Sequence, residues 1–225
     1  MAKITIRPVY FEEIGKILEI ENDAWGEAKA ATRDMFVTRL ETFPEGFFCA
    51  TIDREIKGLC VQEIINIEDF KNTDMSWNTL TDNGYLLKTH NPAGRSLYGV
   101  SISVPPYVSD KRVALALYEY CGKLAIKYNL DKIYTGSRIP KYYKYANKMS
   151  VHEYVYARTQ TGRILDPELA LYVSMGMKIE KIIPNYFNDP ESLNYGVLVS
   201  WANPLYPFTK HSKLLARALS ALFRI

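Results

Sequence analysis

Short segments of alternating polar and apolar residues, separated by segments of helical spacing, predict the first elements of the chain. Lys3 to Arg7 alternates and stops at Pro8, which is typical of a short strand at a sheet edge. Apolar residues recur at helical spacing over residues 11–20, and residues 32–42 predict a second helix capped by Thr32 or a neighbour. Two helices are therefore expected before the second strand.

Two apolar, β-rich segments, residues 47–52 and 56–65, flank the charged link Asp53-Arg54-Glu55. This pattern predicts an antiparallel hairpin. From residue 66 to residue 95 the periodicity gives way to polar residues, Gly and Pro. The segment is expected to be a long insertion, and long ordered loops often carry function.

The second half of the chain continues with strands and helices in turn. Residues 97–104 predict a buried strand, residues 113–128 an amphipathic helix and residues 132–135 a further strand, the spacing of a βαβ crossover. A short helix over 167–175 should end at Gly176, before strands at 178–183 and 195–201. The expected fold class is α/β (α+β mixed): a central mixed, mostly antiparallel, twisted sheet of about seven strands flanked by helices.

Composition favours an ordinary globular chain. Its 225 residues, 48% hydrophobic and 24% charged, are enough for one full core, and a net charge of +3 is too small to indicate nucleic acid as a partner. We expect one domain over residues 1–204 and a basic amphipathic helix over 205–225. Packing of the apolar face of this helix on the domain, or on a second copy in a homodimer, is favoured over contact of its basic face with a membrane surface.

The cysteines and the hydropathy of the chain indicate the cellular compartment in which it is expected. Cys49, Cys60 and Cys121 lie among apolar residues without metal-ligand or redox spacing, so reduced core thiols and no metal site are expected. No apolar run approaches the roughly 20 residues of a membrane span, and the first residues lack a secretory pattern. A cytoplasmic location is expected.

Two local motifs resemble the GNAT superfamily of acyltransferases. The run Ser103-Val104-Pro105-Pro106-Tyr107, followed by a helix, is similar to the strand, pyrophosphate loop and helix of that superfamily. The run Tyr172-Val173-Ser174-Met175-Gly176-Met177 is similar to its Y-x-x-x-G-[FM] motif. Further stretches resemble the GNAT domains fused to carbon-nitrogen hydrolases, and the resemblance covers residues 3–204; these stretches are residues 136–140, 142–149, 154, 166–167, 184–186 and 201–204.

The resemblance implies a GNAT fold and a binding site for acyl-CoA, but the loop departs from the superfamily pattern Q/R-x-x-G-x-G/A. Glycine-rich loops at a helix start let backbone N–H groups approach a pyrophosphate closely. Here Ser109 replaces the Gln or Arg, Arg112 replaces the first glycine, and Asp110 adds a negative charge. The positions that the resemblance assigns to the cofactor are Val104, Ser109, Lys111, Arg112, Val113 and Ala114.

Acyl transfer to an amine needs a base for the amine, a donor for the oxyanion and an acid for the leaving thiolate. By resemblance, Tyr172 is the acid; its structural alternative is a half-buried core aromatic. The base candidates are Glu63 on the third strand and His90 in the insertion, whereas Glu119 is expected on a solvated helix face. The oxyanion donors are expected among backbone groups of residues 102–104.

Arg138 and the tyrosines of residues 142–156 are candidates for an acceptor pocket, and equally for a cap over the sheet.

Two function classes follow. The leading one is an N-acyltransferase that moves an acyl group from acyl-CoA, or from an acyl carrier protein, to a small amine acceptor. The alternative is a catalytically degenerate GNAT-like module that binds a ligand or a protein partner, for which the altered loop is the motivating feature.

Overall fold

The computed structural model describes residues 2–222, and it groups the chain into two compact units. Unit 1 holds the residues up to 66, residues 81–133 and those from 203 onward; unit 2 holds residues 67–80 and 134–202. Within the described residues, seven strands form one sheet in the order β1-β2-β3-β4-β5-β7-β6. The mixed, mostly antiparallel sheet with flanking helices predicted from the sequence is confirmed. The division into residues 1–204 and 205–225 stays a prediction.

Unit 1 is built on four antiparallel neighbours, β1 (Ile4–Pro8), β2 (Phe47–Ile52), β3 (Glu55–Ile65) and β4 (Ser96–Ser103). The predicted hairpin is confirmed, with a two-residue turn at Asp53 and Arg54, whose φ angles are 50° and 68°. Positive φ at both central residues is the type I′ geometry, which matches the twist of the two strands. Glu55, expected in the turn, already pairs with Ile52 in the ladder.

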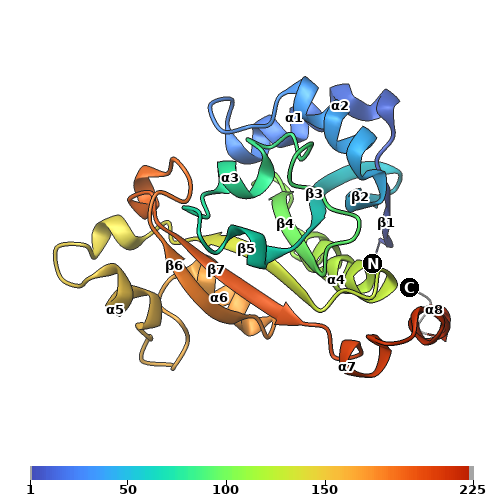
Figure 1. The fold of residues 1–225 in the computed structure, drawn as a ribbon. Helices are drawn as coiled ribbons and strands as arrows, with labels where there is room; N and C mark the ends of the chain where they lie inside the picture. Colours follow the sequence, from blue (N-terminus) through green and yellow to red (C-terminus); the bar gives the residue numbers. More distant parts are fainter. Residues whose placement is uncertain (1, 223–225) are drawn as a thin grey trace. The chain divides into compact units, whose positions relative to one another are not determined.

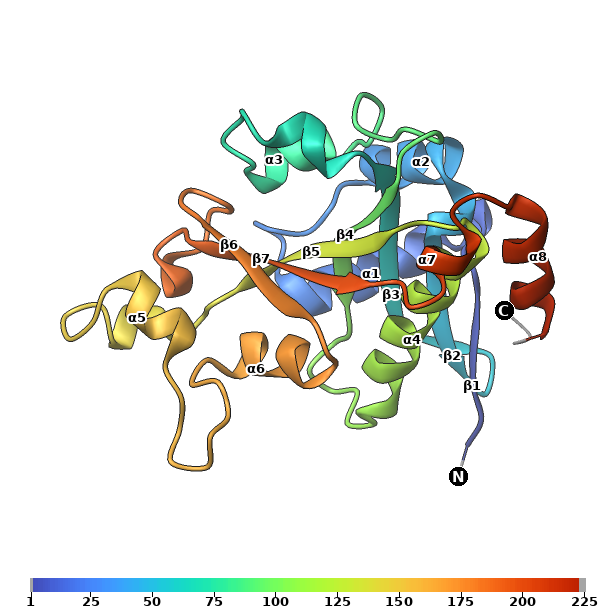
Figure 2. The ribbon, with the colours of Figure 1, turned by 60° about the horizontal axis from the view of Figure 1, so that its bottom comes forward.

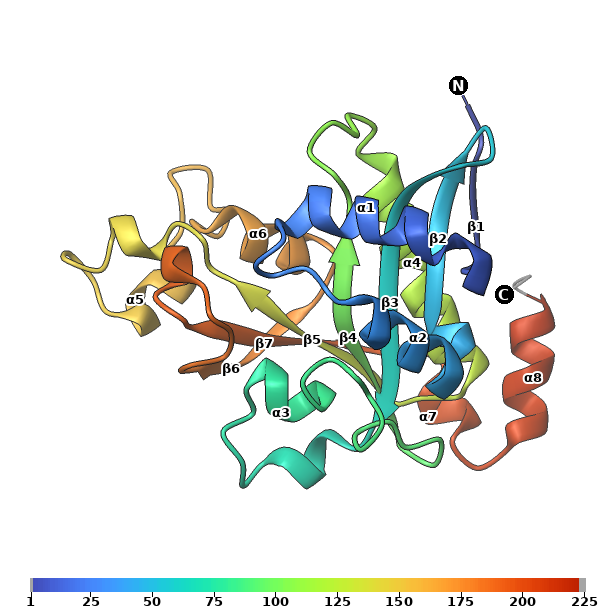
Figure 3. The ribbon, with the colours of Figure 1, turned by 90° about the horizontal axis from the view of Figure 1, so that it is seen from above.

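Helices cover both faces of these strands (Figures 1 and 3). Consecutive residues of a strand point to opposite faces. Phe47 stacks on Phe36 of α2 (Arg33–Thr42) with ring centroids 5.4 Å apart, whereas Phe48 meets Tyr120 of α4 (Arg112–Lys127) at 4.6 Å. Helix α1 (Ile14–Trp25) also lies on the α2 face (Figure 3). Unit 1 is therefore a sheet with two hydrophobic layers.

Strand β4 contains a β-bulge near its middle. Val61 pairs with Ser101 and Gln62 with Gly99, so Val100 is an extra residue on β4. A bulge bends its strand and changes where the following side chains point. It divides β4 into an entering half and an exit half that ends at Ser103.

Unit 2 contains most of β5 (Lys132–Arg138), with β6 (Lys178–Ile183), β7 (Gly196–Ala202), α5 (Val151–Tyr156) and α6 (Pro167–Ser174). Strands β6 and β7 pair antiparallel. The predicted helix over 167–175 is confirmed: the Asp166 carboxylate caps its first turn, accepting from the N–H groups of Glu168 and Leu169, and Gly176 follows it with φ of 83°. These caps place α6 as the sequence indicates.

Short elements complete the chain. The tail, predicted as one helix, forms α7 (Tyr206–Thr209) and α8 (Lys213–Leu222), and α8 contacts α4 (Figure 2). Of the basic positions expected there, Arg224 lies outside the described residues, as do the side chains of Lys213 and Arg217. The remaining elements are η1 (Phe11–Glu13), η2 (Pro44–Gly46), η3 (Ile67–Phe70), α3 (Trp77–Thr81), η4 (Tyr142–Lys144) and η5 (Pro190–Ser192).

A hydropathy search over the described residues finds no helix that is both long and apolar enough to cross a bilayer.

Two glycines of unit 2 make room for the buried ring of Tyr186. A Cβ at Gly136 on β5, or at Gly196 on β7, would overlap atoms of Tyr186. We predict that Gly136→Ala destabilises the protein by about 1–3 kcal/mol, the usual range for overpacking. Gly15→Ala on α1 is the control, because no atom lies within 4 Å of its added methyl group. Urea denaturation measures both variants; equal stability of the two would contradict this packing.

Candidate active site

Four polar side chains are buried on the α1 and α2 side of unit 1. Glu63 of β3 is 0% exposed, Arg39 of α2 1%, Glu21 of α1 3% and Ser103 of β4 1%. Charged groups are almost never buried unless they are paired or hydrogen-bonded, because leaving water costs several kcal/mol per ion. Each of these four groups therefore needs polar partners within the interior.

Glu63 is a carboxyl group with one satisfied oxygen. Thr89 Oγ1 donates to its Oε2 at 2.7 Å, whereas Oε1 has no hydrogen-bond partner among the described residues. Burial raises the pKa of Glu63 to about 8; the Thr89 hydrogen bond and the charge of Arg39 act in the opposite direction, and Asp82 adds to the rise. The carboxyl is thus protonated at neutral pH and titrates close to the range in which a general base works well.

Arg39 supplies the positive charge of this region. Its Nε donates to the carbonyl of Gly84 at 2.8 Å, and its guanidinium lies 5.3 Å from the ring centroid of Phe36, while Nη1 has no partner within the described part of the chain. Burial lowers the pKa of Arg39 to about 10, opposed by the charges of Glu21 and Glu63. Arg39 therefore remains a cation at neutral pH.

Ser103, the last residue of β4, joins that strand to α1. Trp25 Nε1 donates to Ser103 Oγ at 2.9 Å, and Ser103 Oγ donates to Glu21 Oε2. Because an indole N–H only donates, the hydroxyl proton of Ser103 points to the carboxylate. The other oxygen of Glu21 accepts the N–H of Ala31 at 3.3 Å. This chain of hydrogen bonds holds the end of α1 and the following loop against the exit half of β4.

His90, the second base candidate, makes contacts that support the local structure beside β3. Its Nδ1 accepts the N–H of Ile64 at 3.2 Å, and its ring stacks on Phe43 with centroids 4.8 Å apart. Burial lowers the pKa of His90, so it is neutral near pH 7. With Nδ1 used as an acceptor, the ring proton is on Nε2, which leaves neither nitrogen available to take a further proton without breaking the bond to Ile64.

The candidate cofactor positions in and around the loop before α4 fall into two groups, one packed against the sheet and one more exposed. Val104 and Val113 pack over Gly58 of β3, where a Cβ would lie 3.0 Å and 3.1 Å from their side-chain methyl groups. Ser109, Lys111 and Arg112 are exposed and Ala114 is half-buried. Val104 and Val113 therefore have a packing role, whatever else they contact.

Asp110 and Arg112 bind one another at the start of α4. The Asp110 carboxylate accepts the backbone N–H of Arg112 at 3.0 Å and its guanidinium at 2.6 Å and 2.9 Å. The N–H of Val113 donates to the carbonyl of Asp110 at 3.0 Å. Arg112, which the sequence suggests as a phosphate ligand, is thus already bound to an anion of its own loop, the Asp110 carboxylate.

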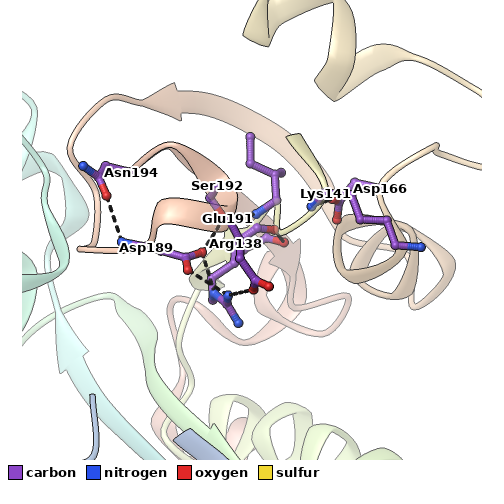
Figure 4. A network of polar contacts seen from close by, with 9 residues as sticks. Arg138, Lys141, Asp166, Asp189, Glu191, Ser192 and Asn194 are labelled. Atoms are coloured by element: carbon purple, nitrogen blue, oxygen red, sulfur yellow. Dashed lines mark hydrogen bonds and ion pairs between the residues drawn. The ribbon is translucent and has the colours of Figure 1, made fainter. Parts of the chain in front are cut away.

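Arg138 of unit 2, a candidate for the acceptor pocket, is anchored to the loop between β6 and β7 (Figure 4). Its Nε and Nη2 donate to the two oxygens of Asp189 at 2.8 Å and 2.9 Å, and Nη2 also donates to Glu191 at 3.0 Å. Ser192 Oγ donates to Asp189 as well, at 2.5 Å. Such a bidentate, partly buried pair fixes the loop, and it is compatible with a structural role as well as with a place in the lining of a pocket.

Tyr172 and the tyrosine-rich segment also lie in unit 2. Tyr172 on α6 is 5% exposed. One turn before it, burial raises the pKa of Glu168 to about 7. Tyr154 donates to Asp166 at 2.9 Å, and the rings of Tyr142 and Tyr145 each lie 5.2 Å from its ring. These three tyrosines pack as a cluster, so their rings contribute to the core of unit 2.

Among the described residues, no group of three His, Cys, Asp or Glu side chains is placed to hold a metal ion. Cys49, Cys60 and Cys121 are free and buried, with the sulfurs of Cys60 and Cys121 3.7 Å apart. Glu119 of α4 is exposed, in keeping with the solvated helix face expected for it.

The sequence does not single out Glu21 or Arg39 as site residues, and it indicates Ser103 only as part of the run before the loop. Helical spacing contains a signal for the first two. Glu21 follows Ile14 and Ile17 at the interval that places all three on one face of α1, and Arg39 lies three residues after the buried Phe36. A charged residue on an apolar helix face is the feature that could have identified them.

Comparison with known proteins gives two relatives, while no family model matches the chain. The uncharacterized N-acetyltransferase YkwB of Bacillus subtilis is 33% identical over 207 residues, which are 90% of each chain. The probable hydrolase YhcX of the same organism is 36% identical over 205 residues, 91% of this chain. The matched region is only 39% of the length of YhcX.

Solved structures agree on the fold. The loading GNATL domain of CurA from Lyngbya majuscula matches with a TM-score of 0.79 and 20% identity, over 89% of this chain and 98% of that domain. The GphF GNAT-like decarboxylase, solved in complex with isobutyryl-CoA, matches with a TM-score of 0.72 and 22% identity, over 88% and 99%. These matches show the fold, and the YkwB match over nearly all of both chains shows the family. The chain belongs to the GNAT-type N-acetyltransferases.

Proposed function

We propose that the protein is an N-acyltransferase that moves an acyl group from a thioester of CoA, or of an acyl carrier protein, to a small amine acceptor, with Glu63 as the general base. The observation that carries this proposal is the buried Glu63 carboxyl with one unpartnered oxygen, on a strand that pairs with β4, in a chain of the N-acetyltransferase family. A glutamine could accept the same hydrogen bond from Thr89, so the structure alone gives no reason for a carboxyl group at this position.

The amine must lose a proton before it attacks. Glu63 can take up this proton only in its ionised form, which is the minor form at neutral pH because its pKa is about 8. Because Oε1 is enclosed, a water molecule would carry the proton from the amine to this carboxylate, which the charge of Arg39 stabilises. We assign His90 to holding the end of β3, since its Nδ1 already accepts the Ile64 N–H.

The thioester carbonyl develops negative charge as the amine adds. Backbone N–H groups of the exit half of β4, near Ile102 to Val104, are the proposed donors to this oxyanion. On collapse of the tetrahedral intermediate the C–S bond breaks, the new C–N bond remains and the thiolate takes up a proton. Tyr172 is proposed as the donor of this proton from its sequence motif alone. The GphF GNAT-like decarboxylase, a chain of this fold, was solved in complex with isobutyryl-CoA, which supports a CoA thioester as a ligand of this protein.

The alternative, a catalytically degenerate module that binds a ligand or protein, draws on two observations. The loop before α4 contains its own ion pair, and the chain matches only part of YhcX, whose remaining length lies outside the match. Under this alternative a partner protein raises the melting temperature and acyl thioesters do not; under the proposed function the thioesters do.

The Tyr172→Phe variant tests the acid role. We predict that it lowers the rate of thiol release from acetyl-CoA, with a panel of small amines as acceptors, by about 100-fold or more, the usual contribution of a positioned acid. Tyr10→Phe, at an exposed tyrosine outside the candidate pocket, serves as the matched control and should keep full activity. An unchanged rate in the Tyr172 variant of an active preparation would remove Tyr172 from the mechanism.

The Glu63→Gln variant tests the environment of the base through stability. The folded state keeps the Glu63 proton up to about pH 8, whereas the unfolded chain releases it near pH 4 to 5, so the free energy of unfolding should fall as pH rises between these values. We predict a contribution of about 1.4 kcal/mol per pH unit, absent in Glu63→Gln.

Urea unfolding at several pH values between 5 and 8 measures this slope. Glu12→Gln, at an exposed carboxyl, is the control and should keep the wild-type slope. Parallel slopes in the wild-type protein and Glu63→Gln would mean that Glu63 is ionised throughout, and a base poised near neutrality would then be excluded.

A further inference from the structure

The start of helix α4 is occupied by a side chain of its own loop. The first N–H groups of a helix have no partner within the helix, and together with the helix dipole they form a natural place for phosphate. Here the Asp110 carboxylate accepts the Arg112 N–H at 3.0 Å, and the Val113 N–H donates to the carbonyl of Asp110 at 3.0 Å. Donors that a phosphate would use are therefore already engaged.

The charge of the loop is balanced as well. Three hydrogen bonds of 2.6–3.1 Å join the Arg112 guanidinium to both oxygens of Asp110. This pairing lowers the pKa of Asp110, so the carboxylate stays ionised at neutral pH. An arriving diphosphate would have to displace a like charge and separate the ion pair, and it would meet a long side chain where a glycine would leave the backbone open.

The strand that precedes the loop has no such obstruction. Its exit half is held by the Ser103 hydrogen bonds to Trp25 and Glu21, and Val104 packs beside Val113 over Gly58. None of these contacts involves Asp110 or Arg112. Strand and loop therefore differ: the strand remains organised, whereas the anion-binding positions of the loop are filled.

We propose that this protein recognises its donor through the acyl-pantetheine arm along β4, and that Asp110 and Arg112 select against the nucleotide diphosphate of CoA. The inference rests on the proposed function and specifies its donor: a pantetheine thioester carried on a protein, in which the arm ends in a single phosphodiester. Asp110 and Arg112 are then specificity-determining residues and take no part in the chemistry.

Calorimetric titration tests the inference without any turnover. The probes are acetyl-CoA and S-acetylpantetheine, which share the acyl arm and differ in the nucleotide, together with an acetyl-loaded acyl carrier protein. The wild-type protein should bind the first two within about threefold of one another, and the loaded carrier protein at least as tightly as S-acetylpantetheine. The double variant Asp110→Ala with Arg112→Gly should bind acetyl-CoA about tenfold more tightly, or better, with S-acetylpantetheine unchanged.

Lys16→Ala combined with Glu19→Ala is the matched control, because it also removes an exposed ion pair without changing the net charge, and it should alter neither affinity. Thermal melting checks that the double variant is folded. Wild-type preference for acetyl-CoA of more than about tenfold, or a double variant without gain, would overturn the donor assignment and leave the acyltransferase proposal standing. Absence of binding by all three probes would overturn both.

Discussion

Arg39 carries a positive charge in the interior of unit 1, where only 1% of its surface is exposed, so the polar groups near it have to balance that charge. Two buried carboxyl groups, Glu21 and Glu63, favour its charged form. They are not equivalent, because Glu21 accepts hydrogen bonds from Ser103 and Ala31, whereas Glu63 accepts one from Thr89 and retains its proton to about pH 8. Arg39 thus lies near two carboxyl groups that differ in their hydrogen bonds, and the Glu63 carboxyl retains its proton at neutral pH.

This arrangement links the fold to its chemistry. Glu21 connects α1 to the end of β4 through its hydrogen bond with Ser103. Arg39 brings the charge of an α2 side chain into the same buried region. Glu63 is on β3, the strand that pairs with β4 and faces its bulge at Val100. The helices that cover the sheet therefore also set the electrostatics of its central strands. A hydrophobic core could have filled this space without the desolvation of polar groups, and the retention of three ionisable side chains is what points to function here.

Most of the fold follows from local patterns in the sequence. The hairpin at Asp53 and Arg54 and the helix that Asp166 begins depend on neighbours in the chain, so periodicity and turn chemistry predict them. The site is different. Glu63 was identified as a candidate on its strand, but its raised pKa depends on burial beneath α1 and α2, and Arg39 and Ser103 gain their importance from residues up to 82 positions away in the chain. Similarly, comparison with the superfamily loop pattern shows that Arg112 replaces a glycine, but only the structure shows that its guanidinium is bound to Asp110.

In the proposed mechanism, the acyl thioester lies along the exit half of β4. Hydrogen exchange of the backbone amides, measured with and without a non-hydrolysable thioether analogue of S-acetylpantetheine, tests it most directly. We predict slower exchange at residues 99–104, with little change at β1 and β2. Unchanged exchange at β4 under saturating analogue, or protection confined to other strands, would contradict the account.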